Sequence, residues 1–221
     1  MHHLHVAGGA RLVTVDGWEV PSVYGGAEAE AQAVRAGAGL WDLSILRKWD
    51  LQGAAVGAAL QPALAAAPGV GRAAQGRLGD EPVMVLRLRE DRALVVGPRR
   101  LAADAAQRAV PPGTCAHVTD VSSGMAALRL AGPGARAILA TLTPVDLADG
   151  ALPDLACLEL GLARVHAVLL RRDLGGLPAF EMYLGRNYGA YLWEACQDAG
   201  RGRGLVACGM ESERAMAGSP R

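Results

Sequence analysis

The sequence predicts an α+β fold, in which strands, helices and hairpins follow one another without a regular alternation. Apolar, strand-like runs occur in pairs joined by short turns, whereas a doubly wound parallel sheet would place a helix after each strand. The tripeptides at 42–44 (DLS) and 120–122 (DVS) are each followed by a strand-like run, a glycine and a helix-forming segment. This internal similarity indicates a duplicated half-domain, with chance in a sequence of low diversity as the alternative.

The first part of the chain predicts an extended arm followed by a helix. Residues 11–24 form the arm, which the turn-forming pair Asp16-Gly17 interrupts. Residues 28–38 have a helix-forming composition, with acidic side chains in the first turn. Gly39 is placed to end this helix, because glycine readily adopts the left-handed conformation that often follows a last helical turn.

The middle of the chain predicts a strand, a helix and a hairpin. Residues 41–53 suit a strand, the Ala- and Leu-rich residues 54–66 suit a helix, and the Gly- and Pro-rich residues 67–79 suit a loop. The runs 83–88 (VMVLRL) and 92–97 (RALVVG) are separated by a short polar turn, which predicts two antiparallel strands.

The second half of the chain repeats this mixture of elements. In chain order we expect a helix at 99–109, strands at 114–121 and 126–131, a helix at 135–142, a strand-like segment at 157–172 with a break at Gly161, a strand at 180–185 and a helix at 191–199 capped by Asn187. With 221 residues and 51% hydrophobic content, the chain can form one domain over 1–221 with a sizeable core.

Composition argues against several classes of protein. The 22 Lys and Arg residues balance the 22 Asp and Glu residues, whereas a nucleic-acid-binding protein needs a basic excess to neutralise phosphates. No stretch of about 18 residues is apolar enough to cross a membrane, and no signal peptide is recognisable. The four cysteines lack a C-x-x-C spacing, so we expect free thiols, no metal site and a cytoplasmic location.

Acidic residues give the clearest candidates for chemistry, since the short motifs of serine hydrolases, P-loop proteins and zinc proteases are missing. Asp80 and Glu81 directly precede a hairpin strand, a place that suits either a catalytic carboxylate or a solvated turn. Glu181 lies in a short apolar strand beside Phe180, the one Phe of the chain. If Glu181 points inward it needs a charged partner or a polar ligand, and if it points outward it faces water.

Basic and imidazole side chains give weaker signals. Arg171-Arg172 and Arg186 flank the strand of Glu181 and could attract a carboxylate, with a solvated arginine cluster as the alternative. His117 and His166 lie in strand-like apolar runs, and we interpret them as histidines whose hydrogen bonds are satisfied within the sheet. The histidines near the N-terminus are interpreted as neither a metal site nor a tag.

Three segments carry motifs of a known family in the family's own order. Residues 9–44 contain the patterns G-W-x-x-P-x-x-Y, E-x-x-A-V-R and G-L-W-D-L-S. Residues 118–139 contain D-V-S followed by L-x-G-P-x-A, and residues 180–196 contain F-E-M-Y-L and L-W-E. Over about residues 4–210 the chain resembles the folate-binding domain of aminomethyltransferases, the T-protein of the glycine cleavage system.

The resemblance implies both a fold and a ligand. The fold would be two duplicated, ferredoxin-like half-domains at about 36–110 and 114–200, and we expect it to lack the family's usual C-terminal barrel domain. Tetrahydrofolate would be the cofactor, bound between the half-domains. The implied site residues are Glu181 as the anchor of the pterin ring, Met84 and Leu86 as its lining, Asp80 or Glu81 as the acid that assists transfer, and Arg214 as a loose match to a later family arginine.

The sequence also departs from the family pattern. The acidic pair that the family places before the hairpin strand falls on Glu81-Pro82, with Asp80 one residue early. The family's G-x-T-G-E loop is here GGL at 175–177, without the glutamate. These departures affect the segments that would carry the catalytic acid and leave the three motif segments unchanged.

Two main functions therefore follow from the resemblance. The first is a tetrahydrofolate-dependent transferase of aminomethyl or methyl groups, with a small-molecule amine or methyl donor. The second is a non-catalytic subunit or scaffold, similar to the gamma subunit of sarcosine oxidase, in which a partner subunit or a second copy covers an apolar face. A third possibility is a relative that binds some other planar small molecule.

Overall fold

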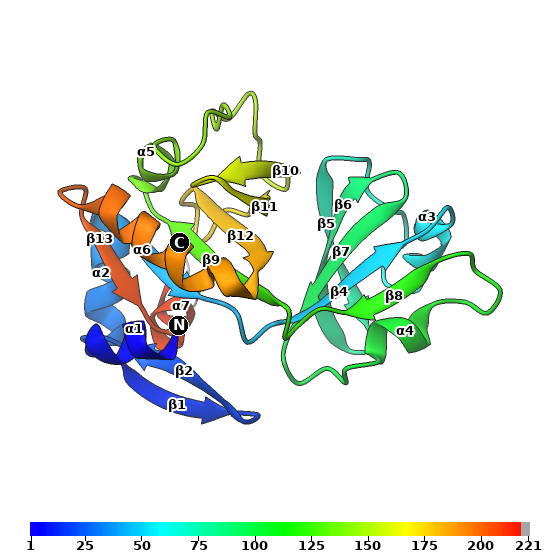
Figure 1. Ribbon diagram of the computed structural model, residues 1–221, viewed down its shortest axis with the longest axis horizontal. Coiled ribbons are helices and arrows are strands. Elements are labelled where there is room, and N and C mark those ends of the chain that lie inside the picture. Colours follow the sequence, from blue (N-terminus) through cyan, green and yellow to red (C-terminus); the bar gives the residue numbers. More distant parts are fainter. Residues whose placement is uncertain (218–221) are drawn as a thin grey trace.

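The computed structural model describes residues 1–217 and consists of two lobes joined by two crossing connections (Figure 1). The first lobe contains a six-stranded sheet with the order β10-β11-β12-β9-β3-β13. The second lobe contains a five-stranded sheet with the order β5-β6-β7-β4-β8. A separate hairpin, β1-β2, lies beneath the first lobe (Figure 1). This mixed arrangement confirms the α+β fold class.

The strands are β1 (Arg11–Val15), β2 (Trp18–Val23), β3 (Ala38–Asp42), β4 (Arg47–Gln52), β5 (Arg72–Leu78), β6 (Glu81–Arg89), β7 (Arg92–Gly97), β8 (His117–Asp120), β9 (Met125–Ala131), β10 (Cys157–Leu162), β11 (Val165–Arg171), β12 (Ala179–Gly185) and β13 (Leu205–Cys208). The helices are α1 (His2–Ala7), α2 (Ala27–Ala36), α3 (Val56–Ala59), α4 (Ala105–Ala109), α5 (Ala135–Leu139), α6 (Gly189–Gly200) and α7 (Met210–Ala217), with a 3₁₀ turn at Arg186–Tyr188.

The two sheets are built by the same sequence of elements. The second lobe contains the succession β4-α3-β5-β6-β7-α4. The first lobe repeats this succession as β9-α5-β10-β11-β12-α6. The corresponding strands also lie in the same spatial order, β5-β6-β7-β4 and β10-β11-β12-β9. With β5 set aside as an added edge strand, the order β6-β7-β4-β8 is that of a ferredoxin-like sheet. The boundaries of the halves at 36–110 and 114–200 stay a prediction.

The repeated tripeptides mark the two places where the chain passes between the lobes. Strand β3 precedes β4 in sequence but pairs with β9 of the other sheet, and β8 precedes β9 but pairs with β4. At both crossings the Asp accepts a 2.8 Å hydrogen bond from the Ser backbone N–H, from Ser44 to Asp42 and from Ser122 to Asp120. Ser44 Oγ accepts from Ala127 N–H at 3.1 Å and Ser122 Oγ from Lys48 N–H at 3.0 Å. The crossings are thus related by an approximate twofold symmetry.

The glycine that ends each repeated strand is required for this close approach. Gly53 has φ of 142° and Gly132 has φ of 121°, conformations that other residues rarely adopt. A Cβ atom would lie 2.5 Å from the Cys115 carbonyl oxygen at Gly53, and 2.6 Å from the Gly37 carbonyl oxygen at Gly132. Both glycines therefore let a neighbouring backbone pass next to the strand end.

Alternating side chains of the two sheets build three apolar layers. In β6 and β7, Leu86 and Leu94 face a cluster between the sheets, whereas Val85 and Val95 face the helices α3 and α4 of the second lobe. The outer cluster of the first lobe packs under α5 and α6. The middle cluster joins both sheets, so this layer positions whatever lies between the lobes.

Several local expectations are confirmed and others are wrong. The hairpin expected at 83–88 and 92–97 is β6-β7, and the arm expected at 11–24 is the hairpin β1-β2. The loop expected at 67–79 is wrong for its second half, which forms β5 by pairing along β6. The helix expected at 54–66 is limited to α3, since Pro62 has no backbone N–H to continue it and the chain goes on through turns.

Three expected boundaries are also corrected. Gly39 does not end α2 but lies within β3, and Gly37 follows the helix. The break in the 157–172 segment falls at Ala163-Arg164, which form the two-residue turn between β10 and β11 with φ of 48° and 67°. Asn187 does not cap α6, because it lies within the 3₁₀ turn and Tyr188 precedes the helix.

The histidines differ from their interpretation. His117 and His166 are exposed at the surface of β8 and β11, and His166 Nε2 lies 3.4 Å from Glu159 Oε1 on the neighbouring strand β10. His5 on α1 is instead the buried histidine: its Nδ1 lies 2.7 Å from the Tyr24 hydroxyl and its Nε2 lies 2.9 Å from Asp42 Oδ2. His5 therefore fixes the N-terminal helix to the end of β3.

Candidate functional site

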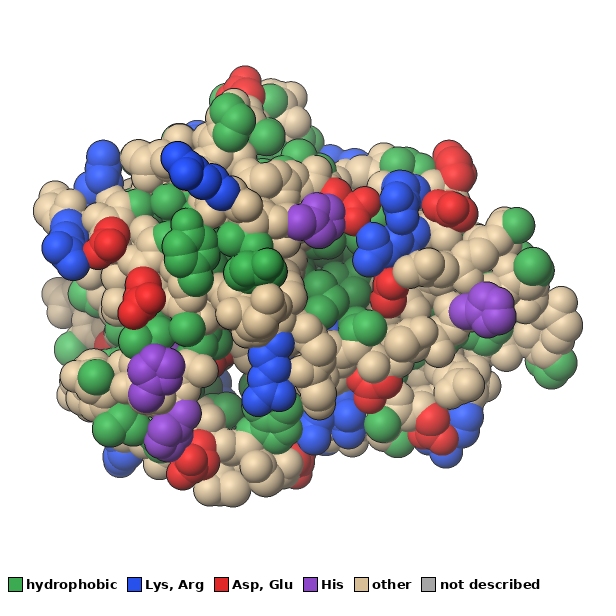
Figure 2. All heavy atoms as spheres, viewed as in Figure 1, with side chains coloured by type: hydrophobic (Ala, Val, Ile, Leu, Met, Phe, Trp, Pro, Cys, Tyr) green, Lys and Arg blue, Asp and Glu red, His purple; other side chains and the backbone are tan. Residues whose placement is uncertain are grey.

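A small cavity of about 220 Å³ lies where the two lobes meet, and we call it the interlobe cavity. Figure 2 shows hydrophobic side chains in the hollow between the lobes. The second lobe supplies most of the wall from β6 and β7, and the first lobe supplies one acid and one arginine. The lining residues are Leu46, Gln75, Pro82, Val83, Met84, Val96, Gly97, Pro98, Arg172 and Glu181.

Glu181 reaches this cavity because of the alternation of β12. Its neighbours Phe180 and Met182 face the outer cluster of the first lobe, so Glu181 faces the opposite side, toward the second lobe. Only 1% of its side chain is exposed. Of the two orientations that the sequence left open, the structure has the inward one, with charged partners.

Three side chains donate to the Glu181 carboxylate. Arg129 Nη2 lies 2.6 Å from Oε1, Arg172 Nη1 lies 3.5 Å from the same oxygen, and the Tyr183 hydroxyl donates to Oε2. Burial alone raises the pKa of Glu181, but the two guanidinium groups and the hydroxyl outweigh it, so this pKa lies below its usual value. Burial and the neighbouring negative charge raise the pKa of Tyr183 well above its usual value. Glu181 is therefore an ionised acceptor.

Arg129 lies behind Glu181 and away from solvent. It is the cross-strand partner of Glu181 in the β9-β12 pair, and 6% of its side chain is exposed. Its Nη1 also donates to Glu213 of α7. Arg129 therefore connects the carboxylate of the cavity to the last helix of the described chain.

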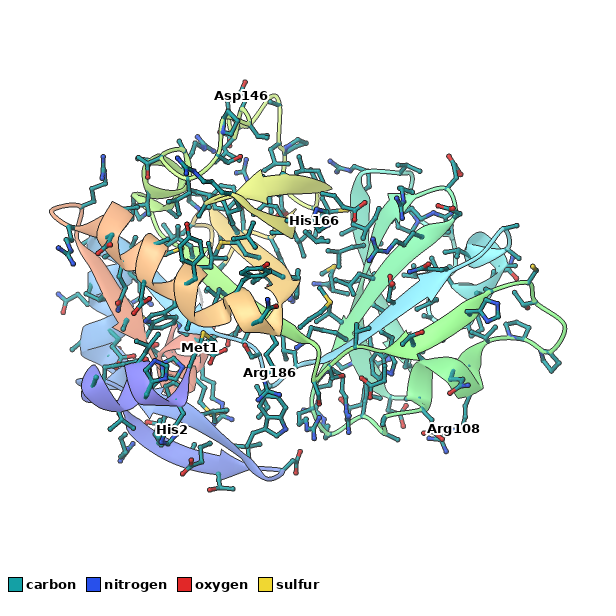
Figure 3. The ribbon with its side chains drawn as sticks, in the orientation of Figure 1. Met1, His2, Arg108, Asp146, His166 and Arg186 are labelled. Carbon is teal, nitrogen blue, oxygen red and sulfur yellow. The ribbon has the colours of Figure 1, made fainter. Side chains whose placement is uncertain are left out.

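The arginines next to Glu181 have separate roles. Arg171 is buried and forms ion pairs with Asp149 and Asp173. Arg186 lies between the lobes below β12 (Figure 3), and its guanidinium is 5.5 Å from the Trp18 ring. Arg172 alone of the three lines the interlobe cavity, with 39% of its side chain exposed. The three arginines therefore do not form one anion-binding cluster.

The structure brings together only part of the expected site. Met84 and Glu181 both line the interlobe cavity. Leu86 is fully buried in the cluster between the sheets and is not part of the cavity wall. Arg214 is exposed on α7, one residue after the Glu213 that contacts Arg129.

The expected catalytic acids are not among the residues that line the cavity. Asp80 is exposed in the turn between β5 and β6. Glu81 begins β6 and forms an ion pair with Arg100, which holds its pKa below the usual value. Pro82 and Val83 follow directly and line the cavity, so both acids are close to it in sequence but absent from its wall. Glu181 is the one acid among the lining residues.

Sequence reasoning missed Arg129, Leu46 and Val96. One signal could have found Arg129: it is a single charge inside the apolar run AALRLA, directly after the second repeated tripeptide. Such a residue needs a buried counter-charge, and Glu181 was the available inward candidate. Leu46 lies at the first crossing, and only the three-dimensional arrangement places it on the cavity.

A second hollow of about 380 Å³ lies between the β1-β2 hairpin and the first lobe. Its lining includes Trp18, His5, Asp42 and Arg186. His5 and Asp42 are bonded to each other, and Arg186 is stacked on Trp18. These polar groups therefore serve the packing of α1 and of the β1-β2 hairpin against the first lobe. Among residues 1–217, no cluster of His, Cys, Asp or Glu is suited to hold a metal ion, and no helix is long and apolar enough to span a bilayer.

Comparison with known proteins places these two sheets of repeated topology in a family. The chain belongs to the GCVT N-terminal domain family, whose model matches residues 1–217. The relatives are aminomethyltransferases. That of Streptomyces avermitilis is 36% identical over 98% of this chain and 62% of its own length, and that of Streptomyces coelicolor is 34% identical over 98% and 61%. The chain thus spans about three fifths of the curated relatives it matches.

Solved structures agree on the fold. The glycine cleavage system aminomethyltransferase T from Bartonella henselae superposes with a TM-score of 0.83 at 22% identity, over 98% of this chain and 60% of that chain. A chain of the heterotetrameric sarcosine oxidase from Corynebacterium sp. U-96 superposes with a TM-score of 0.63 at 22% identity, over 88% of this chain and 94% of that chain. The family resemblance expected from the sequence motifs is confirmed.

Proposed function

We propose that this chain binds the pterin ring of tetrahydrofolate in the interlobe cavity, and that it serves the transfer of a one-carbon unit from an amine or methyl donor. The observation that carries the proposal is the ionised Glu181 carboxylate in the wall of a small, otherwise mostly apolar cavity. The family and its aminomethyltransferase relatives support this assignment.

The residues present fit the ring of the cofactor. A pterin offers adjacent N–H donors, and a carboxylate accepts such a pair as it accepts a guanidinium. Leu46, Met84 and Val96 supply apolar walls that suit the faces of a flat ring. A cavity of about 220 Å³ is small for a drug-sized ligand, which needs about 300 Å³ or more, so the ring fits and the remainder of the cofactor extends outward.

The chain's own residues support binding more strongly than transfer. When bound, tetrahydrofolate supplies the nitrogen that accepts the one-carbon unit. Glu181 orients the ring, and Met84 and Leu46 exclude water from it. We propose Asp80 or Glu81 as the acid that assists transfer, which requires Glu81 to leave Arg100 or the exposed turn of Asp80 to move inward.

A second candidate function is a non-catalytic subunit of an amine-oxidising or demethylating complex. Two observations favour it: Asp80 and Glu81 lie outside the cavity wall, and the fold extends over 94% of a sarcosine oxidase chain. Under this proposal a partner subunit or a second copy completes the site. We also propose the cytoplasm as its compartment, since the four thiols are unpaired.

The test of cofactor binding is a calorimetric titration with tetrahydrofolate. We expect binding by the wild type and its loss in Glu181→Gln, which removes the charge of the carboxylate. Glu159→Gln is the matched control, because Glu159 is a partly buried, ion-paired glutamate on β10 and does not line the cavity. Met84→Trp fills the cavity without touching its charges and should also abolish binding. Equal affinity in wild type, Glu181→Gln and Met84→Trp would refute the site.

The test of the subunit role is the mass of the protein in solution at rising concentration. Light scattering that shows association, together with absent tetrahydrofolate binding, favours the second candidate. A monomer that binds tetrahydrofolate favours the first.

A further inference from the structure

Arg172 makes the weakest of the three contacts to Glu181. Its Nη1 lies 3.5 Å from Oε1, whereas Arg129 Nη2 lies 2.6 Å from the same oxygen. Arg172 is also the exposed member, with 39% of its side chain in solvent against 6% for Arg129. Because a released guanidinium at this position regains water, Arg172 can leave Glu181 at little cost, and Arg129 cannot.

The number of hydrogen bonds that the Glu181 carboxylate can accept decides which of its present donors a ligand must displace. A carboxylate has about four acceptor positions, two on each oxygen. Arg129 and Arg172 use both positions of Oε1, and Tyr183 uses one position of Oε2. One position is therefore open, on Oε2. A ligand that donates two adjacent N–H groups needs one position on each oxygen, and Arg172 is the partner that can yield.

Along one edge of a pterin ring, two hydrogen-bond donors are followed by a hydrogen-bond acceptor. Its 2-amino group and N3–H are donors, and the 4-oxo oxygen beside them is an acceptor. A guanidinium that has just been displaced from a carboxylate carries free N–H donors next to that oxygen. The pair Glu181 and Arg172 thus matches a row of two donors and one acceptor.

We propose that Arg172 transfers its hydrogen bond from Glu181 to the 4-oxo oxygen of a bound pterin, and that it thereby strengthens the preference of the cavity for 4-oxo over 4-amino pteridines. This inference rests on the proposed function of the interlobe cavity. Arg129 and Tyr183 keep their contacts and hold the carboxylate in place. Arg172 is a specificity residue, and Glu181 remains the anchor.

A 4-amino group in place of the 4-oxo group reverses this match, and it also removes the hydrogen from N3, so that Glu181 loses one of its two ligand donors. The guanidinium has N–H donors and no acceptor, so it meets another donor and is left without its partner. Sites built to hydrogen-bond a polar group can reject analogues by factors of about 10⁴, but the partial exposure of Arg172 lets water compensate. We therefore expect a preference of about ten- to one-hundred-fold.

The probes are folic acid and aminopterin, which differ in the 4-oxo and 4-amino groups. Calorimetry gives both affinities for the wild type, Arg172→Met and Arg11→Met. Methionine keeps the apolar length of arginine and removes its donors. Arg11→Met is the matched control, because Arg11 is an exposed, ion-paired arginine on β1. Melting curves of each variant report that it is folded.

The wild type and Arg11→Met should prefer folic acid by about ten-fold or more. Arg172→Met should reduce the preference by about five-fold through weaker binding of folic acid, and the remaining preference comes from the N3–H donor that aminopterin lacks. If the wild type binds the two probes alike, or aminopterin more tightly, the inference is overturned while the proposed cavity stands. A preference in Arg172→Met as large as that of the wild type also overturns it. Binding of neither probe, nor of tetrahydrofolate, refutes the proposed function and this inference together.

Discussion

Glu181 and Arg129 are direct cross-strand partners in the β9-β12 pair, and their side chains form a buried ion pair 2.6 Å long. Both point toward the second lobe, because both strands alternate with the same register. An isolated carboxylate at 1% exposure would lose its hydration without compensation. The guanidinium of Arg129 therefore makes it possible to keep a charged acceptor at the junction of the lobes.

Removal of Arg129 should destabilise the protein strongly. Arg129→Met leaves Glu181 buried with the weaker Arg172 contact and the Tyr183 hydroxyl. We expect a loss of about 3–5 kcal/mol in the free energy of unfolding, the usual cost of breaking a buried ion pair from one side. Urea denaturation measures it. The double variant Arg129→Met/Glu181→Met should recover much of the loss, and a single variant within about 1 kcal/mol of wild type would contradict the role of the pair.

The single lysine of the chain should give stability a distinctive pH dependence. Lys48 is fully buried, its Nζ donates to the carbonyl oxygens of Ser44 and Leu46 at 2.9 Å, and burial lowers its pKa to about 8. Between about pH 8 and pH 10.5 the unfolded chain holds a proton at this site that the folded chain has released. The contribution of Lys48 to stability is thus present above pH 10.5 and lost as the pH falls through 8.

The measurement is urea denaturation of wild type and Lys48→Met across this range. The free energy of unfolding of the wild type, taken relative to Lys48→Met, should rise by roughly 3 kcal/mol from pH 7 to pH 11. Subtraction of the variant removes the contributions of other groups that titrate in the range. Parallel curves for the two proteins would show that Lys48 is not the group responsible.

The four thiols should react in two classes. Cys115 is exposed, whereas burial raises the pKa of Cys157, Cys196 and Cys208 to about 12. The thiolate is the reactive form, so these three react slowly both because they are inaccessible and because they stay protonated. With a disulfide reagent at pH 8 we expect one fast thiol in the native protein and four in denaturant. Loss of the fast phase in Cys115→Ser identifies it, and several fast native thiols would argue against this packing.

The buried histidine should contribute to the attachment of the N-terminal helix. His5→Phe keeps the edge-on ring contact with Trp193 but removes the hydrogen bonds to Tyr24 and Asp42. The two partners are then left unsatisfied, and we expect a loss of about 1–3 kcal/mol in thermal or urea unfolding. His3→Phe, at an exposed position on the same helix, serves as the control. Equal stability of the two variants would contradict the role of His5.

The elements predicted well from sequence are those whose pattern is local. The hairpin β6-β7 follows from two apolar runs and a short turn, and the duplication follows from two tripeptides with their glycines. Strand β5 was missed because its sequence RAAQGRL has no alternation of its own, and it is a strand only through its pairing with β6. The interpretation of His117 as satisfied within the sheet was wrong, because it also depended on strand pairing. Strand β8 lies at the edge of its sheet, so an apolar run there does not imply burial.

The sequence by itself determined the α+β class, the repeated units that begin at 42–44 and 120–122, and the presence of a carboxylate in the strand of Phe180. Only the tertiary structure decided which side of the sheet Glu181 faces and which charges surround it. Its partner Arg129 lies 52 residues away in the chain, and the register that opposes them comes from strand pairing across the sheet. The cavity itself combines residues from both lobes, so no local pattern encodes it. Long-range pairing, rather than residue type, therefore made Glu181 an ionised acceptor at the junction of the lobes.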